Sequence, residues 1–219
     1  MRIGLFGGMF DPPHIGHVSV MRDVSKALGL DVMCMVPCFD PPHRNDSETS
    51  FLMREMLCES ALHHLRGHEG TRFLVSDVES HLDLPNYTYN TIEAIKAESD
   101  GELFLVLGED EYASFPNWRF PDRIIAECEI VCAMRSGSGE QPRQPMDGER
   151  VTFVSVDEPE GISSTMIRER LRRGEDVDGL IPDGVKSLIY ILGLYGVEPS
   201  IDYVKRTTGI DVEEMAKGV

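Results

Sequence analysis

Two histidines that follow a glycine pair are the first residues whose types and spacing suit chemistry. An apolar run ends at Gly7-Gly8, the chain turns through Asp11-Pro12-Pro13, and a helix is predicted to begin near His14. Glycine lets a ligand approach the backbone closely, and a helix start offers unpaired N–H groups and a positive dipole end. His14 and His17 are three residues apart, so both imidazoles lie on one helical face. The stretch predicts a phosphate site, with a zinc site that includes Asp11 as the less favoured alternative.

A second candidate anion site lies far along the chain, between a predicted strand and a predicted helix. It contains Ser163, Ser164 and Thr165, and Arg168 follows one helical turn later. Either serine suits the N-cap position of the helix. The alternative is that the hydroxyls and free amides bind an anion, with Arg168 forking onto phosphate oxygens. Taken alone, this segment is more typical of a capping serine beside a surface arginine.

Two further side chains suit a nucleotide. Asp110 follows a predicted strand, where an acidic residue can accept hydrogen bonds from ribose hydroxyls. Trp118 is the single tryptophan, and Pro116 places it near a loop. An indole in a pocket stacks on aromatic rings, and a positively charged pyridine ring favours that contact. An anchor in the core or at the surface is the alternative for an isolated tryptophan.

Short apolar runs alternate with amphipathic segments along the chain, which predicts an α/β fold. The expected strands are Arg2–Phe6, Val32–Val36, Arg72–Val75, Leu103–Leu107, Ile130–Met134 and Thr152–Val156. The expected helices are His14–Leu28, Phe51–Arg66, Thr88–Glu98, Asp122–Glu127, Ser164–Arg173 and Asp183–Leu192. We expect a Rossmann-like, doubly wound parallel sheet with helices on both faces, and ligands at the carboxyl ends of its strands. A small helical part begins at about residue 163, residues 196–219 form an extension, and residues 136–149 form a mobile surface loop.

Length and charge exclude several classes of protein. The 219 residues suit one main domain, expected over residues 1–195, and a formal net charge of −17 argues against a nucleic-acid binder. Five cysteines without a C-x-x-C pair suit buried thiols in a reducing compartment. A signal peptide and a long apolar run are both missing, so we expect a cytoplasmic protein with no membrane partner. A homo-oligomer is compatible with the sequence.

The two phosphate motifs resemble those of a known superfamily. His14-Ile15-Gly16-His17 resembles the H-x-G-H signature of the nucleotidyltransferases, and residues 161–168 resemble their second ATP motif. Class I aminoacyl-tRNA synthetases share the first signature, but this chain is short and acidic and lacks their lysine motif. Further stretches resemble bacterial nicotinate mononucleotide adenylyltransferases, over residues 1–195 in total: Pro41-Pro42-His43-Arg44, Asn86-Tyr87-Thr88, Leu107-Gly108-Glu109-Asp110, Phe115-Pro116-Asn117-Trp118 and Arg135-Ser136-Gly137.

The resemblance implies a role for each matching residue. It implies His14, His17 and Arg168 as catalytic groups. For ATP it implies Gly7, Gly8, Met9, Phe10, Gly108, Asp110, Ser163, Ser164 and Thr165. For nicotinate mononucleotide it implies His43, Arg44, Tyr87, Thr88, Asn117, Trp118 and Arg135, with backbone N–H groups near Thr88 and Trp118 meeting the ring substituent. Met9 stands where the family has Thr or Ser, and Glu109 where it has a small residue.

The implied reaction is adenylyl transfer from ATP to nicotinate mononucleotide, giving nicotinate adenine dinucleotide and pyrophosphate in NAD biosynthesis. Mg²⁺ is expected on the phosphate oxygens rather than in a protein metal site. Nicotinamide mononucleotide and phosphopantetheine are alternative acceptors, although phosphopantetheine enzymes lack the additional stretches. A regulatory protein that binds nucleotide without turnover is a further alternative, which intact His14, His17 and Arg168 disfavour. The two phosphate motifs alone are also compatible with a cytidylyltransferase.

Overall fold

A single parallel sheet carries the fold in the computed structural model, which describes residues 1–40, 47–65, 70–135, 142–157 and 161–200. Its strands within these residues are β1 (Arg2–Gly8), β2 (Val32–Pro37), β3 (Arg72–Val75), β4 (Glu102–Gly108), β5 (Glu129–Arg135) and β6 (Val151–Val156). The order is β3-β2-β1-β4-β5-β6, and every neighbouring pair is parallel. The predicted parallel α/β sheet is therefore confirmed.

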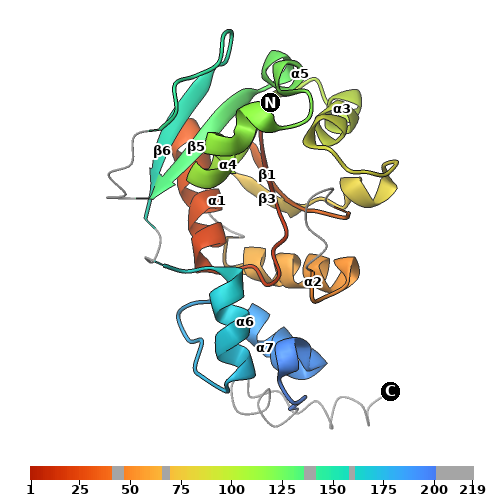
Figure 1. Cartoon of the computed structure of the whole chain (residues 1–219), viewed down its shortest axis with the longest axis vertical. Coiled ribbons are helices and arrows are strands. Elements are labelled where there is room, and N and C mark those ends of the chain that lie inside the picture. Colours follow the sequence, from red (N-terminus) through yellow and green to blue (C-terminus); the bar gives the residue numbers. More distant parts are fainter. Residues whose placement is uncertain (41–46, 66–69, 136–141, 158–160, 201–219) are drawn as a thin grey trace.

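Helices cover both faces of this sheet, as expected for a doubly wound fold. The helices are α1 (Ile15–Leu28), α2 (Phe51–Leu62), α3 (Thr88–Glu98), α4 (Glu109–Ser114), α5 (Pro121–Glu127), α6 (Ser164–Arg172) and α7 (Asp183–Leu192). Short 3₁₀ turns lie at His63–Leu65, Val78–His81, Phe115–Asn117 and Leu194–Gly196. Helices α1 and α2 pack on one face, and α3, α4 and α5 pack on the other (Figure 1).

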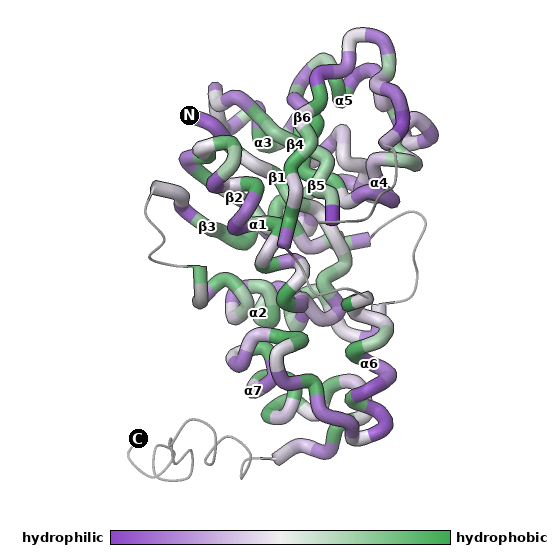
Figure 2. Tube along the Cα trace, turned by 90° about the vertical axis from the view of Figure 1, so that its left-hand side faces the viewer, coloured by the Kyte–Doolittle hydropathy of each residue, from purple (hydrophilic) through white to green (hydrophobic). Residues whose placement is uncertain are grey.

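The apolar run of β4 shows why both faces are covered. Side chains alternate across a strand, so a continuous apolar run presents a hydrophobic surface on each side. Leu103, Leu105 and Leu107 enter the cluster that contains α3, α4 and α5, whereas Phe104 and Val106 enter the cluster that contains α1 and α2. Figure 2 shows the strands as largely hydrophobic, whereas α4 and α6 contain hydrophilic stretches.

Helices α6 and α7 form a layer at the end of the molecule toward which the strands run (Figure 1). Helix α7 contacts α2, and its Val185 and Ile189 are buried in the same cluster as Ile167 of α6. The backbone N–H of Ile15 at the start of α1 donates to the carbonyl of Leu180 at 3.0 Å. This layer therefore closes the carboxyl edge of the sheet, where the ligand site was expected.

The structure corrects some predicted elements. The helix expected to reach residue 66 ends at Leu62, and α4 was missed because six residues with an acidic start carry no hydrophobic period. Residues 142–149 belong to the loop expected to be mobile, yet Arg143 forms an ion pair with the buried side chain of Glu149 at 2.7 Å and lies over the Tyr112 ring. The described part of that loop is therefore anchored.

The cysteines are free thiols. Cys58, Cys128 and Cys132 are buried, as expected, whereas Cys34 and Cys38 are only half-buried. Burial raises the pKa of the Cys34 thiol to about 11, which keeps it protonated near neutral pH. Within the described part of the chain, every helix is too short or too polar to cross a membrane.

Candidate active site

A cleft of about 1520 Å³ opens at the carboxyl ends of β1 and β4, the two central strands where the strand order reverses. Doubly wound sheets bind their ligands at this point. All the sequence-predicted site residues within the described ranges line it: Gly7, Gly8, Met9, Phe10, His14, His17, Tyr87, Thr88, Gly108, Asp110, Asn117, Trp118, Arg135, Ser163, Ser164, Thr165 and Arg168. His43 and Arg44 lie outside the described residues.

The loop after β1 exposes backbone to the cleft. Strand β1 runs two residues further than predicted, and Gly7 and Gly8 pair with Val36 and Pro37 of β2. A Cβ on Gly7 would meet no protein atom within 4 Å, so a ligand can reach the main chain there. A Cβ on Gly8 would lie 3.0 Å from the ring of Phe10, so a larger residue at position 8 would push that ring out of its place.

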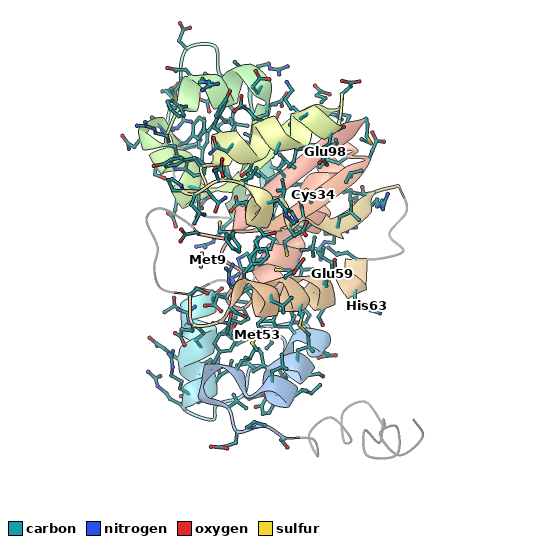
Figure 3. The ribbon with its side chains drawn as sticks, turned by 90° about the vertical axis from the view of Figure 1, so that its right-hand side faces the viewer. Met9, Cys34, Met53, Glu59, His63 and Glu98 are labelled. Atoms are coloured by element: carbon teal, nitrogen blue, oxygen red, sulfur yellow. The ribbon has the colours of Figure 1, made fainter. Side chains whose placement is uncertain are left out.

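A buried arginine of α2 anchors this loop by a hydrogen bond to its backbone. Arg54 is 2% exposed, and its Nη1 donates to the carbonyl of Met9 at 3.0 Å. Figure 3 shows Met9 between the sheet and α2. The main-chain contact does not depend on the residue type at position 9, so the loop keeps its anchor although Met9 replaces the hydroxyl residue of the family. Sequence reasoning missed Arg54, because an arginine in a helix usually lies at the surface.

The two histidines form a stacked pair at the start of α1. His14 is the N-cap, and its ring centroid lies 3.6 Å from that of His17 with 20° between the planes. Nδ1 of His17 accepts the backbone N–H of His14 at 3.1 Å. An imidazole that accepts at Nδ1 carries its proton at Nε2 when it is neutral, so His17 keeps one donor for a ligand. Phe10 fixes the ring of His17 by an edge contact at 4.9 Å.

Both imidazoles are neutral near pH 7. Burial, followed by the positive charge of Arg135, lowers the pKa of His14 to about 4. Burial, followed by the neighbouring His14, lowers the pKa of His17 well below its usual 6.5. The pair therefore offers neutral N–H donors to an anion rather than two positive charges.

The second phosphate motif lines the same cleft, with a division of roles that the sequence left open. Ser163 is the N-cap of α6, and its hydroxyl accepts the N–H of Met166 at 3.2 Å. The hydroxyl of Ser164 donates to the carbonyl of Pro12 at 2.8 Å. The Ser164 hydroxyl is therefore engaged by the protein in this structure, and its expected role toward phosphate stays a prediction. What the motif presents to the cleft is the helix start itself, with the exposed Thr165.

Arg168 is joined to the loop after β1 through Asp11. Its Nη1 donates to the backbone carbonyl of Asp11 at 2.7 Å, across 157 residues. The carboxylate of Asp11 is 2% exposed and accepts hydrogen bonds from the N–H of Glu48, the hydroxyl of Thr49 and the hydroxyl of Tyr195. Asp11 thus holds the two phosphate motifs together. From the sequence, this residue was expected in a turn or, as the less favoured alternative, in a zinc site, and its link to Arg168 was not foreseen.

The tryptophan forms part of the same cleft. Trp118 packs edge-on against Phe115 and its Nε1 donates to Ser114 at 3.3 Å. The backbone N–H of Trp118 itself donates to the carbonyl of Phe115 at 2.9 Å, and the expectation that N–H groups near it meet a ring substituent stays a prediction. The N–H of Thr88, at the first position of α3, has no acceptor within its own helix and lines the cleft.

Two buried polar residues lie beside α3: Glu79, which sequence reasoning missed, and Asn86, which it named only as part of a motif. Glu79 accepts the N–H of Phe39 and the hydroxyl of Thr91, each at 3.0 Å, and burial raises the pKa of its carboxyl group. Asn86 donates from Nδ2 to the Glu79 carbonyl at 3.0 Å, and no described group pairs with its Oδ1. Both residues line the cleft, and together they fix the start of α3 against the end of β2.

The carboxyl ends of β4 and β5 supply charges of both signs. The backbone N–H of Arg135 donates to Oε1 of Glu109 at 3.1 Å, so this departure from the family pattern ties the two strand ends together. Asp110 is exposed in the first turn of α4. Since the charge of Arg135 lowers the pKa of His14, it acts at the phosphate end of the cleft.

This fold and this site define a class. A doubly wound sheet whose switch point is lined by two helix starts that suit anions is a nucleotide-binding α/β protein. Comparison with family models agrees, because residues 5–170 match the cytidylyltransferase-like model.

Comparison with individual proteins narrows the class. The chain is 33% identical to a probable nicotinate-nucleotide adenylyltransferase of Pseudomonas fluorescens, over 89% of this chain and 97% of that protein. It is 34% identical to a protein of the same name from Geobacillus thermodenitrificans, over 91% and 88% of the two chains. The chain therefore belongs to the cytidylyltransferase-like family and, within it, to the nicotinate-nucleotide adenylyltransferases.

A solved structure supports the fold. The Plasmodium falciparum nicotinic acid mononucleotide adenylyltransferase complexed with NaAD is 20% identical, with a TM-score of 0.73. The match covers 91% of this chain and 99% of that chain.

Proposed function

We propose that the protein transfers the adenylyl group of ATP to nicotinate mononucleotide, releasing pyrophosphate and forming nicotinate adenine dinucleotide for NAD biosynthesis. One observation carries the proposal: the stacked His14–His17 pair, the start of α6 with Arg168, and the Trp118 wall line a single cleft. Its volume of about 1520 Å³ exceeds that of a usual one-ligand pocket, which suits two nucleotides side by side.

The chemistry requires positioning rather than a strong base. An oxygen of the mononucleotide phosphate attacks the α-phosphorus of ATP, the new P–O bond forms, and the bond to the bridging oxygen of pyrophosphate breaks. A phosphate dianion is already a nucleophile, so the protein has to align two anions and stabilise the charge on the leaving oxygens. His17 through Nε2–H, the first amides of α6 and Arg168 supply donors for that charge.

Magnesium is proposed to enter with ATP as part of the substrate. The side chains that we assign to the phosphates are neutral or cationic, and Mg²⁺ prefers oxygen ligands with several of its waters kept. In the described ranges, acidic, histidine and cysteine side chains are not gathered in groups of three or more that suit a metal ion. Phosphate oxygens of ATP are therefore the ligands that fit. The five free thiols also favour the reducing cytoplasm as its compartment.

The acceptor is tested by pyrophosphate release with Mg²⁺, ATP and one acceptor at a time. We expect the highest kcat/KM with nicotinate mononucleotide, a lower value with nicotinamide mononucleotide and none with phosphopantetheine. ATP binding without release of pyrophosphate with any acceptor would contradict the proposal and identify a nucleotide-binding regulatory protein. CTP in place of ATP tests the cytidylyl alternative in the same assay.

A further inference from the structure

Glu48 bridges two arginines of α6 beside the cleft, and the adenylyl transfer described above leaves it without a role. Its Oε1 lies 2.8 Å from Nε of Arg168, and its Oε2 pairs with Nη2 of Arg172. The hydrogen bond from Arg172, followed by that from Arg168, holds the pKa of the Glu48 carboxyl group below its usual value. Glu48 is therefore ionised near neutral pH, as an ion pair requires.

Glu48 is itself held in place by Asp11. The backbone N–H of Glu48 donates to Oδ2 of Asp11 at 2.7 Å, and the hydroxyl of Thr49 donates to Oδ1 at 2.7 Å. The backbone carbonyl of the same Asp11 accepts Nη1 of Arg168 at 2.7 Å. Asp11 therefore acts on Arg168 in two ways. Its carboxylate fixes Glu48, which contacts Nε of Arg168, and its backbone carbonyl contacts Nη1 directly.

These two contacts define the direction of the guanidinium. Its Nε and Nη1 are engaged by Glu48 and by the Asp11 carbonyl, on two different edges of the planar group. Nη2 makes only a long contact of 3.4 Å, to the hydroxyl of Thr165 in the cleft wall, among the described residues. Nη2, which the two donor edges of the guanidinium share, is therefore the nitrogen left for a phosphate.

We propose that Glu48 is a positioning residue, which holds Arg168 so that its Nη2 meets the polyphosphate of ATP. This inference rests on the proposed function. The side chains of Arg168 and Glu48 are 15% and 34% exposed, and ion pairs so near the surface contribute little to stability. Their effect is geometric: an arginine that is restrained before binding loses less conformational freedom when phosphate arrives.

The test compares three variants with the intact chain. We expect Glu48→Ala to lower kcat/KM for ATP about tenfold, because a misdirected group loses alignment at the reacting phosphate. Glu48→Gln keeps an acceptor for Nε and is expected to recover most of that loss. Arg172→Gln removes the other partner of Glu48, outside the cleft, and is expected to change kcat/KM less than about twofold. An unchanged kcat/KM in Glu48→Ala would overturn the inference. An improved kcat/KM would also overturn it, because it would show that Glu48 competes with phosphate for Arg168.

A double-mutant cycle separates positioning from a general structural role. In an Arg168→Gln background there is no guanidinium to direct, so Glu48→Ala is expected to have less than about a twofold further effect. Equal losses in both backgrounds would overturn the inference. Affinity for Mg-ATP, measured by calorimetry without an acceptor, repeats the cycle independently of turnover. If the cycle shows this coupling in Mg-ATP affinity but the wild-type protein releases no pyrophosphate, the proposed function is contradicted and the inference about Glu48 stands.

Discussion

The hydroxyl of Tyr195 donates a 2.8 Å hydrogen bond to Oδ1 of Asp11, across 184 residues. Both side chains are buried, and Asp11 belongs to the loop that follows β1 whereas Tyr195 lies in the turn after α7. The contact joins the C-terminal layer to the phosphate end of the cleft.

Tyr195→Phe is expected to destabilise the protein by about 2 kcal/mol, because a buried carboxylate loses a charged hydrogen bond. In a protein of this size the melting temperature should fall by roughly 5 °C. Thr49→Val is the matched control, because the Thr49 hydroxyl donates to the same Oδ1 of Asp11. Thr49 is more exposed than Tyr195, so water can replace its hydroxyl, and a smaller loss of stability is expected. Thermal and urea unfolding measure both. Equal losses for the two variants would contradict the assignment of the larger effect to burial.

His17→Asn is expected to lower kcat by about 10²–10³-fold with little change in stability. The amide oxygen of Asn can accept the His14 N–H in place of Nδ1, whereas the donor at Nε2 is lost. His17→Gln extends an amide toward the Nε2 position and should retain more activity than Asn. Turnover is measured by pyrophosphate release, with circular dichroism as the folding control. Near wild-type turnover of a folded His17→Asn protein would remove His17 from the mechanism.

Stability is expected to fall on acidification, partly through His14. Its pKa is lowered to about 4 in the folded protein, from 6.5, so the unfolded chain binds the proton more tightly. The stabilisation is complete above pH 6.5 and is lost as the pH falls toward 4, by ~2 kcal/mol between pH 7.5 and 5. Asn is a good N-cap and does not titrate, so His14→Asn should become more stable relative to wild type as the pH falls. Parallel slopes of unfolding free energy against pH would contradict this.

A higher kcat/KM is expected for nicotinate than for nicotinamide mononucleotide. The N–H of Thr88 at the start of α3 is a donor, and a carboxylate only accepts hydrogen bonds. A carboxamide turns N–H groups toward some donors and leaves polar groups unpaired, which costs roughly 1–3 kcal/mol for each group. Ratios of ten or more are expected from the pyrophosphate assay with both acceptors. Equal efficiency, or preference for the amide, would contradict this reading of the pocket.

The sequence by itself determined the features that depend on neighbours along the chain. Continuous apolar runs such as that of β4 predicted strands covered on both faces, and their order with the helices predicted the parallel sheet. The spacing of His14 and His17 predicted that the two rings lie together, and they do, although His14 is the N-cap and not a helical residue. The resemblance of the short motifs then predicted the family.

Only the tertiary structure decided which polar groups remain available to a ligand. Ser164 matches its motif, yet its hydroxyl donates to the carbonyl of Pro12, 152 residues away in the sequence. Asp11 and Glu48 look like ordinary turn and surface residues, but packing brings both onto Arg168. Hydrogen bonds between residues more than a hundred positions apart depend on how the helices pack against the sheet. A local sequence pattern does not specify that packing, so such partners are known only from the tertiary structure.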